Sequence, residues 1–149
     1  MVSDETHVMT NRILVTGGAG YIGSHTVYEL IRTGYEVVIL DNFSTGHRSF
    51  TQGCKVIECD LRDRQSLNKA FEANEFDAVM HFAAKSVVSE SVRNPLDYFE
   101  NNVIGSINLI RAVTEKRIKA FVFSSTAAVY GDPITEIIDE QHPIKPINP

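Results

Sequence analysis

The chain has 149 residues, of which 43% are hydrophobic and 22% charged, and its formal net charge at pH 7 is −5. This length can bury one domain core, and the composition is that of an ordinary globular protein. The negative charge and the lack of a basic run argue against a nucleic-acid partner, and no apolar run is long enough to cross a membrane. Residues 1–10 contain no apolar leader segment, and we expect them to form a disordered extension.

A glycine-rich stretch follows the first predicted strand, Arg12–Thr16. It opens into a helical pattern over Tyr21–Thr33, so strand, glycine turn and helix come in the order of a pyrophosphate-binding cradle. In such a cradle, Gly17 permits the tight turn, Gly20 lets a phosphate approach the backbone, and Gly23 lets the helix pack closely on the strand. The free N–H groups and the positive end of the helix dipole then face the anion.

An acidic residue follows the second predicted strand, Glu36–Leu40. Asp41 lies 24 positions after Gly17 (41 − 17), close to the spacing of roughly 20 residues expected for a ribose-binding acid. Its carboxylate would accept hydrogen bonds from the ribose hydroxyls of adenosine and would repel a 2′-phosphate. The pattern therefore predicts NAD rather than NADP as the cofactor, and the alternative is a glycine turn that binds no ligand.

Two cysteines flank the third predicted strand, Lys55–Glu58. Cys54 and Cys59 are separated by an odd number of positions, which places them on opposite faces of a continuous strand. We therefore expect neither a disulfide nor a metal-binding pair, and we predict no metal site. Two free thiols are typical of a reducing compartment, which predicts a cytoplasmic location.

Asp60 follows the third strand and has two interpretations. At that position an acid can hold the adenine amino group of a dinucleotide, but it can also cap a helix. Asp63 is a second candidate cap, for a helix whose core face comprises Leu67, Ala70 and Phe71.

Chemically distinct residues follow the fourth and fifth predicted strands. The fourth strand, Asp77–His81, ends in a histidine that we interpret as a structural residue within its own hydrogen bonds rather than a catalyst. The small residues of Phe82–Ala84 would let the backbone run close to a cofactor, with packing alone as the alternative. The fifth strand, Ala120–Ser124, leads into hydroxyl residues at Ser124–Thr126, which could donate to a substrate oxygen or simply form a turn.

The longest helical pattern lies between these two strands, and Asn94-Pro95 gives it a cap and a first helical residue. It carries two apolar stripes, although a surface helix needs only one. The additional stripe predicts either a partner subunit, giving a homodimer through residues 95–115, or cover by another part of the same protein. One stripe comprises Leu96, Phe99, Val103, Ile107 and Ile110, and the other comprises Tyr98, Gly105, Leu109 and Ala112.

Strands that alternate with helices predict an α/β fold with a doubly wound parallel sheet, that is, a Rossmann-like NAD-binding domain over residues 11–131. Ligands in such sheets bind at the carboxyl ends of the strands. Residues 132–149 contain several prolines and little periodicity. We expect them to form a loop that leads to a substrate domain outside this sequence, so the fold would be incomplete.

Taken together, these motifs resemble the extended short-chain dehydrogenase/reductase family, and within it the nucleotide-sugar epimerases. The resemblance is to the amino-terminal half of such enzymes and runs from about residue 11 to residue 149. The stretches that carry it are Thr16–His25, Leu40–Asn42, His81–Ala84, Pro95–Tyr98, Asn101–Val103 and Phe123–Gly131.

The resemblance implies that UDP-glucose and UDP-galactose are interconverted at C4: a tyrosine base takes the hydroxyl proton, while NAD takes and returns the hydride. Thr126 would hydrogen-bond the reacting oxygen, and Ser124 would lie beside the nicotinamide. Alanines follow Thr126 where the related dehydratases carry an acid, so epimerisation is favoured over elimination. The cofactor site would comprise Gly17, Gly20, Tyr21, Ile22, Gly23, Asp41, Asn42, Asp60, Leu61, Phe82, Ala83, Ala84, Asn101 and Ser124.

Two features depart from the family pattern. A lysine common at the position of Ser86 occurs one place earlier, at Lys85, and we assign neither residue a cofactor role. None of the five tyrosines has a lysine four residues later, so we expect the tyrosine–lysine pair of the family to begin immediately after Pro149. The 149-residue chain alone would then be inactive and would bind NAD weakly at best. The alternative is a non-catalytic module of the same fold that binds NAD or a nucleotide sugar.

Overall fold

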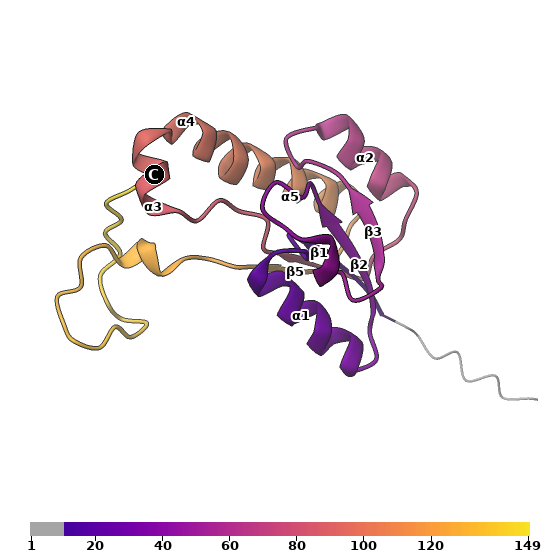
Figure 1. The fold of residues 1–149 in the computed structure, drawn as a ribbon, viewed down its shortest axis with the longest axis horizontal. Helices are drawn as coiled ribbons and strands as arrows, with labels where there is room; N and C mark the ends of the chain where they lie inside the picture. Colours follow the sequence, from indigo (N-terminus) through magenta and orange to yellow (C-terminus); the bar gives the residue numbers. More distant parts are fainter. Residues whose placement is uncertain (1–10) are drawn as a thin grey trace, which may run out of the picture.

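A computed structural model describes residues 11–149, in which helices flank one parallel sheet (Figure 1). The five strands lie in the order β3-β2-β1-β4-β5, and every neighbouring pair is parallel. The strand order reverses between β1 and β4, which is the switch point of a doubly wound, Rossmann-like fold. The strands are β1 (Arg12–Thr16), β2 (Glu36–Asp41), β3 (Lys55–Glu58), β4 (Ala78–His81) and β5 (Ala120–Phe123).

Helices cover both faces of this sheet. Helix α1 (Tyr21–Arg32) lies on one face, and α2 (Arg64–Glu72) and α5 (Gly105–Glu115) pack side by side on the other (Figure 1). The remaining helical segments are short: η1 (Arg48–Phe50), α3 (Val88–Arg93), α4 (Pro95–Tyr98), the π-helical η2 (Phe99–Ile104) and η3 (Ala127–Tyr130).

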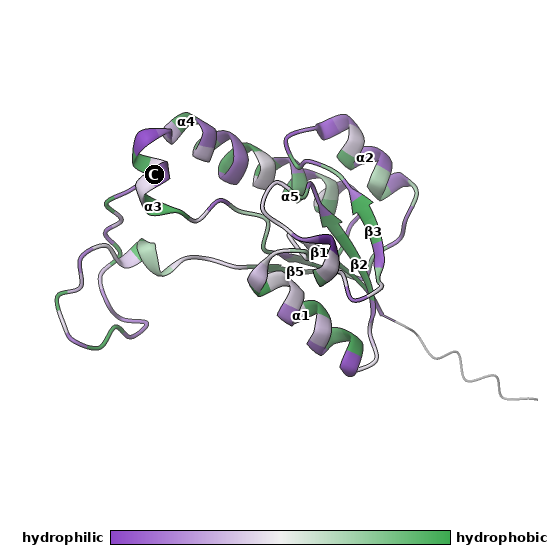
Figure 2. Ribbon diagram, viewed as in Figure 1, coloured by the Kyte–Doolittle hydropathy of each residue, from purple (hydrophilic) through white to green (hydrophobic). Residues whose placement is uncertain are grey.

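Each face of the sheet has its own apolar core. On the α1 face, Val27 packs with Val15 and Ile39 of the strands, and all three are fully buried. On the opposite face, Leu67 of α2 and Leu109 of α5 pack over the strands and are equally buried. Because helices cover both faces of the centre of the sheet, β1 and β2 are nearly continuous apolar runs, and Figure 2 shows β2 as largely hydrophobic.

The structure confirms all five predicted strands, whose ends differ from the predicted ends by at most one residue. The predicted helix from Tyr21 ends one residue early, at Arg32. The side chain of Asp63 caps α2 as predicted, because it accepts the N–H of Ser66 at 3.1 Å. The two cysteines are free and face opposite sides of the sheet, as predicted.

Residues 95–115 are helical throughout, as the sequence predicts, but the helix is not uniform. They form α4, the wider π-helical turns of η2, and then α5. Asn94 is the N-cap residue of α4 and Pro95 is its first residue, as predicted, although the side chain of Asn94 makes no capping hydrogen bond. The backbone N–H of Asn94 bonds to the carbonyl of Glu90 at 2.8 Å, so the same residue also ends α3. The sequence predicts neither α3 nor η1 and η3, since each is too short to display a helical period.

The two apolar stripes of residues 95–115 have different surroundings. Tyr98, Leu109 and Ala112 belong to the stripe that faces the body of the domain, and each is at most 3% exposed. The other stripe is 40–76% exposed, so nothing within residues 11–149 covers it. Its members are Leu96, Phe99, Val103, Ile107 and Ile110.

The chain leaves the sheet after β5. Figure 1 shows it passing through η3, forming a wide loop and returning towards α3. Residues 132–149 contain no helix or strand. The extension predicted for residues 1–10 lies outside the described residues. Between residues 11 and 149, no helix has the length and apolar content that a membrane crossing requires.

Candidate dinucleotide-binding site

Glycines close the turn between β1 and α1 and leave no room for side chains. Gly17 has a φ of +70°, and its N–H donates to the carbonyl of Leu40 at 2.8 Å. A Cβ atom on Gly17 would lie 2.6 Å from the backbone nitrogen of Ala83, and one on Gly23 would overlap the Gly17 carbonyl. The tight turn predicted at Gly17 is therefore confirmed, and Gly23 packs closely against that turn.

The amino-terminal end of α1 opens onto the adjoining cavity. Gly20 occupies the cap position, and within residues 11–149 no side chain caps the helix and no acid stands in its first turn. A Cβ atom on Gly20 would meet only the carbonyl of Gly17, at 3.2 Å, so this side of the turn is open. Uncapped N–H groups at the positive end of a helix dipole form a cradle for an anion such as a pyrophosphate.

Asp41 is fixed by the backbone beside this cradle. Its carboxylate is buried and accepts the N–H of Ala19 at 3.0 Å and the N–H of Phe43 at 2.8 Å. Each oxygen keeps further acceptor capacity, because an ionised carboxylate can accept about four hydrogen bonds. The geometry thus presents a fixed, negatively charged acceptor at the carboxyl end of β2.

Asp60 accepts hydrogen bonds from two neighbouring side chains. The side-chain amide of Asn42 donates to its carboxylate at 2.9 Å, and the guanidinium of Arg62 does so at 2.7 Å. The hydrogen bonds from Arg62 are the main reason why the pKa of Asp60 lies well below its usual range, although partial burial opposes them. The capping interpretation of Asp60 is wrong, because Asp63 caps α2.

One cavity of about 900 Å³ unites the predicted residues at the carboxyl ends of the strands. The glycine turn, the ends of β2 and β3, the loop after β4 and the hydroxyl residues after β5 all border it. The predicted residues that line it are Gly17, Gly20, Tyr21, Ile22, Gly23, Asp41, Asn42, Asp60, Leu61, Phe82, Ala83, Ala84, Asn101, Ser124 and Thr126.

His81 lies beneath the cavity in a buried hydrogen-bond network. Its Nδ1 is 2.6 Å from the hydroxyl of Thr16, and its Nε2 is 2.8 Å from the hydroxyl of Ser106. Burial lowers the pKa of His81 to about 4, so the ring is neutral at pH 7. The prediction of a histidine held in its own hydrogen bonds is confirmed.

Several residues that line the cavity are not predicted by the sequence. Asn102 accepts the backbone N–H of Lys85 at 2.9 Å and donates to its carbonyl at 3.0 Å, which clamps the loop after β4. The ammonium group of Lys85 pairs with Asp97. Cys59 also borders the cavity, and burial raises the pKa of its thiol to about 11, so it is protonated at neutral pH. No local pattern signals these contacts, because each joins separate segments.

The hydroxyl residues after β5 border the cavity but are exposed to solvent. The N–H of Ser124 donates to the carbonyl of His81 at 3.1 Å, which continues the pairing of β4 with β5. The hydroxyl of Thr126 accepts the N–H of Ala128 at 3.2 Å and caps η3. A hydroxyl that accepts one hydrogen bond still has a proton to donate, so Thr126 can donate a hydrogen bond to an oxygen atom in the cavity.

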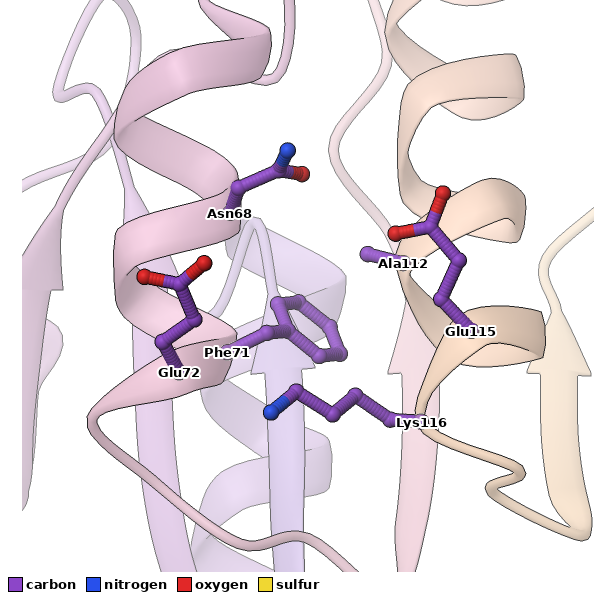
Figure 3. A pocket seen from close by; sticks show the side chains of 6 residues that line it. All are labelled: Asn68, Phe71, Glu72, Ala112, Glu115 and Lys116. Atoms are coloured by element: carbon purple, nitrogen blue, oxygen red, sulfur yellow. The ribbon is translucent and has the colours of Figure 1, made fainter.

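A second cavity, of about 130 Å³, lies between α2 and α5. Figure 3 shows the ring of Phe71 between the two helices, with Glu72 on one side and Glu115 and Lys116 on the other. These residues are at the carboxyl ends of their helices, which lead back to the amino-terminal edge of the sheet. This cavity is therefore remote from the edge where such folds bind ligands.

The parallel sheet, its switch point and the glycine turn define the class of protein: a dinucleotide-binding α/β domain. Residues 13–149 match the NAD dependent epimerase/dehydratase family, and the chain belongs to that family.

Individual relatives are UDP-glucose 4-epimerases. That of Halalkalibacterium halodurans is 49% identical over 137 residues, which are 92% of this chain and 41% of that protein. A crystal structure of UDP-glucose 4-epimerase has a TM-score of 0.88 and 45% identity, over 93% of this chain and 42% of that one. The Brucella ovis enzyme, solved in complex with NAD, has a TM-score of 0.87 and 43% identity, with the same coverage. The chain thus spans less than half the length of each of these relatives.

Proposed function

We propose that this chain is the NAD-binding, amino-terminal part of a UDP-glucose 4-epimerase. The observation that carries the proposal is the single cavity that joins the glycine turn, Asp41 and the hydroxyl residues after β5. The family membership and the similarity to epimerases, one of them solved with NAD, support the same cofactor and reaction.

The residues present fit NAD. The N–H groups at the start of α1 would bind the pyrophosphate, and Asp41 would accept hydrogen bonds from the adenosine ribose. Asp60 would accept from the adenine amino group, and the clamped loop after β4 would leave room for the rest of the dinucleotide. When bound, NAD accepts a hydride from the sugar and returns it. The remaining lining residues would position the nicotinamide end: Phe82, Ala83, Ala84, Asn101 and Ser124.

The substrates in this proposal are UDP-glucose and UDP-galactose, which would place the enzyme in galactose metabolism. Thr126 would donate a hydrogen bond to the reacting sugar oxygen from the cavity wall. Ala127 and Ala128 follow it, and neither can protonate a leaving hydroxyl. This absence of an acid favours epimerisation over elimination.

The chain contains no tyrosine followed by a lysine four residues later, and Thr126 cannot replace such a base. We therefore propose that the 149 residues alone do not turn over a sugar nucleotide and bind NAD weakly. A non-catalytic NAD or nucleotide-sugar binding module is the second candidate. Turnover by a preparation that ends at Pro149 would contradict the proposed inactivity.

We further propose that the exposed stripe of residues 95–115 forms a homodimer interface and that the protein is cytoplasmic. Support for the dimer comes from the contiguous apolar side chains of this stripe, which would otherwise contact water. The free thiols support a reducing compartment. Sedimentation should show Ile107→Glu shifting a dimer to monomer, while Gln65→Glu, at an exposed position of α2 outside residues 95–115, should leave the dimer intact.

Titration of the chain with NAD tests the cofactor proposal. Asp41→Asn retains the side chain's size but removes the charge and one acceptor oxygen, and we expect at least a tenfold weaker Kd, or about 1.4 kcal/mol. Asp63→Asn is the matched control, because Asp63 lies outside the cavity. NADP should bind more weakly than NAD to the unmodified chain. Equal NAD affinity for Asp41→Asn and the unmodified chain would overturn the assignment of this cavity.

A further inference from the structure

The loop after η3 closes on itself. The N–H of Lys145 donates to the carbonyl of Val129 at 3.0 Å. Gly131, where the loop starts, has a φ of +65°, and a Cβ atom there would overlap the carbonyl of Lys145. Beyond this closure, Asn148 and Pro149 line the 900 Å³ cavity. The closure of the loop therefore decides where this part of the cavity wall lies.

His142 makes the contacts that connect the two sides of the loop. It is the only buried residue between 131 and 149, with 7% of its surface exposed. Its Nε2 is 3.1 Å from the backbone nitrogen of Ile134, and its Nδ1 is 3.2 Å from the carbonyl oxygen of Pro143. The ring of Tyr130, on η3, packs edge-on against it at a centroid distance of 5.5 Å. One imidazole thus joins the two sides of the loop to η3.

These contacts define the tautomer of the ring. The N–H of Ile134 can only donate, so Nε2 must carry a lone pair, and the carbonyl of Pro143 can only accept, so Nδ1 must carry the proton. A doubly protonated ring would place two N–H groups against each other at Ile134. The other titratable side chains on the segments around the ring are Tyr130, Asp132, Glu136, Asp139, Glu140 and Lys145, and the carboxylate of Asp139 accepts the N–H of Gln141.

We propose that neutral His142 is a positioning residue that closes the 131–145 loop and so holds η3 and Asn148-Pro149 at the cavity. Thr126 caps the first turn of η3, so the loop also determines where the Thr126 hydroxyl lies. His142 does not line the cavity and acts only through the loop. The role in a reaction rests on the proposed function, whereas the closure of the loop does not.

Amide hydrogen exchange and NMR of the full 149-residue chain test this proposal. We expect the nitrogen shifts of His142 to report the neutral Nδ1–H tautomer at pH 8. In His142→Leu, protection of the Ile134, Lys145 and Ala128 amides should fall at least tenfold, while the amides of β1 stay protected. His142→Gln should restore protection, because its carbonyl oxygen can accept from Ile134. His142→Asn is too short to reach Ile134 and should not restore it.

An Nε2–H ring at pH 8, or full protection of Lys145 and Ala128 in His142→Leu, would overturn the proposal. NAD affinity, measured in parallel, should change less than threefold in His142→Gln. Equal NAD affinity for Asp41→Asn and the unmodified chain would contradict the proposed function and leave the loop result unaffected.

Discussion

The cavity has two walls that are built in different ways. The glycine wall, residues 16–24, consists of backbone packed directly on backbone, and β1 beneath it is fully buried at Leu14 and Val15. The loop wall, residues 124–149, is largely exposed, and a few hydrogen bonds around His142 hold it. The same chemical change should therefore have a global effect at the first wall and a local effect at the second.

Gly23→Ala should have the largest effect, because it adds a Cβ atom where the Gly17 carbonyl already lies. Neither backbone segment can move without disturbing the core, so we expect a loss of about 3 kcal/mol in the free energy of unfolding. NAD affinity should fall more than tenfold, because the start of α1 moves. Urea unfolding and NAD titration measure the two effects.

Gly34→Ala is the control for this substitution. Gly34 has a φ of +91° but nothing within 4 Å of its added Cβ atom, so the cost is backbone strain of about 1–2 kcal/mol. NAD affinity should be unchanged, since Gly34 follows α1 at the far end from the cavity. An equal loss of NAD affinity in both variants would refute the steric explanation.

Acidification should lower the free energy of unfolding, because His81, which is buried beneath the glycine wall, must then be protonated in a buried site. Its pKa falls from the ordinary 6.5 to about 4 on folding, so the unfolded chain binds the proton more readily. The free energy of unfolding is therefore highest above pH 6.5. As the pH falls towards 4, it should decrease by about 3 kcal/mol. Unfolding in urea at several pH values should show this slope, and His81→Asn should remove it.

Asp60 can be compared with His81, because folding lowers the pKa of both groups. Asp60 is an acid, so the lowered pKa favours its charged form, whereas the lowered pKa of His81 favours its neutral form. The contribution of Asp60 is present above the ordinary carboxylate value of 3.8 and is lost only below it. The two groups thus act in adjacent pH ranges. A slope between pH 6.5 and 4 that persists unchanged in His81→Asn would exclude His81 as its source.

Gly131→Ala makes the same kind of clash in the loop wall. The added Cβ atom would overlap the carbonyl of Lys145, in a backbone conformation that favours glycine. The exposed loop can open to relieve the clash, so we expect a global cost of only about 1 kcal/mol. Exchange at Lys145 should become fast while β1 stays protected. A loss of stability as large as that of Gly23→Ala would show that the two walls are equally rigid.

The contrast also explains what the sequence could predict. Gly17 and Asp41 were predictable because strand, turn and helix follow one another along the chain, and the following strand ends beside the turn. The buried histidine at position 81 was recognisable from its place at a strand end. These inferences need only local patterns and the general rule that ligands bind at the carboxyl ends of parallel strands.

The remaining features depend on contacts between distant segments. Asn102 clamps Lys85 across 17 positions, from a π-helical turn that an apolar period does not indicate. His142 reaches Ile134 within a loop that has no periodicity at all. The sequence predicted the helix start at Asn94 but not the short helix α3 that ends at the same residue. Such features follow from tertiary packing, which single-sequence patterns do not encode.

Thr126→Ala should have the smallest effect on folding, because the residue is exposed and its hydroxyl makes one hydrogen bond, with Ala128. We expect a loss of about 0.5–1 kcal/mol, typical of a missing cap, and NAD affinity close to that of the unmodified chain. Thr126→Ser should retain both the cap and the stability. Protection of the Ala128 amide should separate the two variants even where the unfolding curves nearly coincide. If alanine left this amide as protected as serine does, the hydroxyl would not cap η3, and the loop around His142 alone would hold this wall.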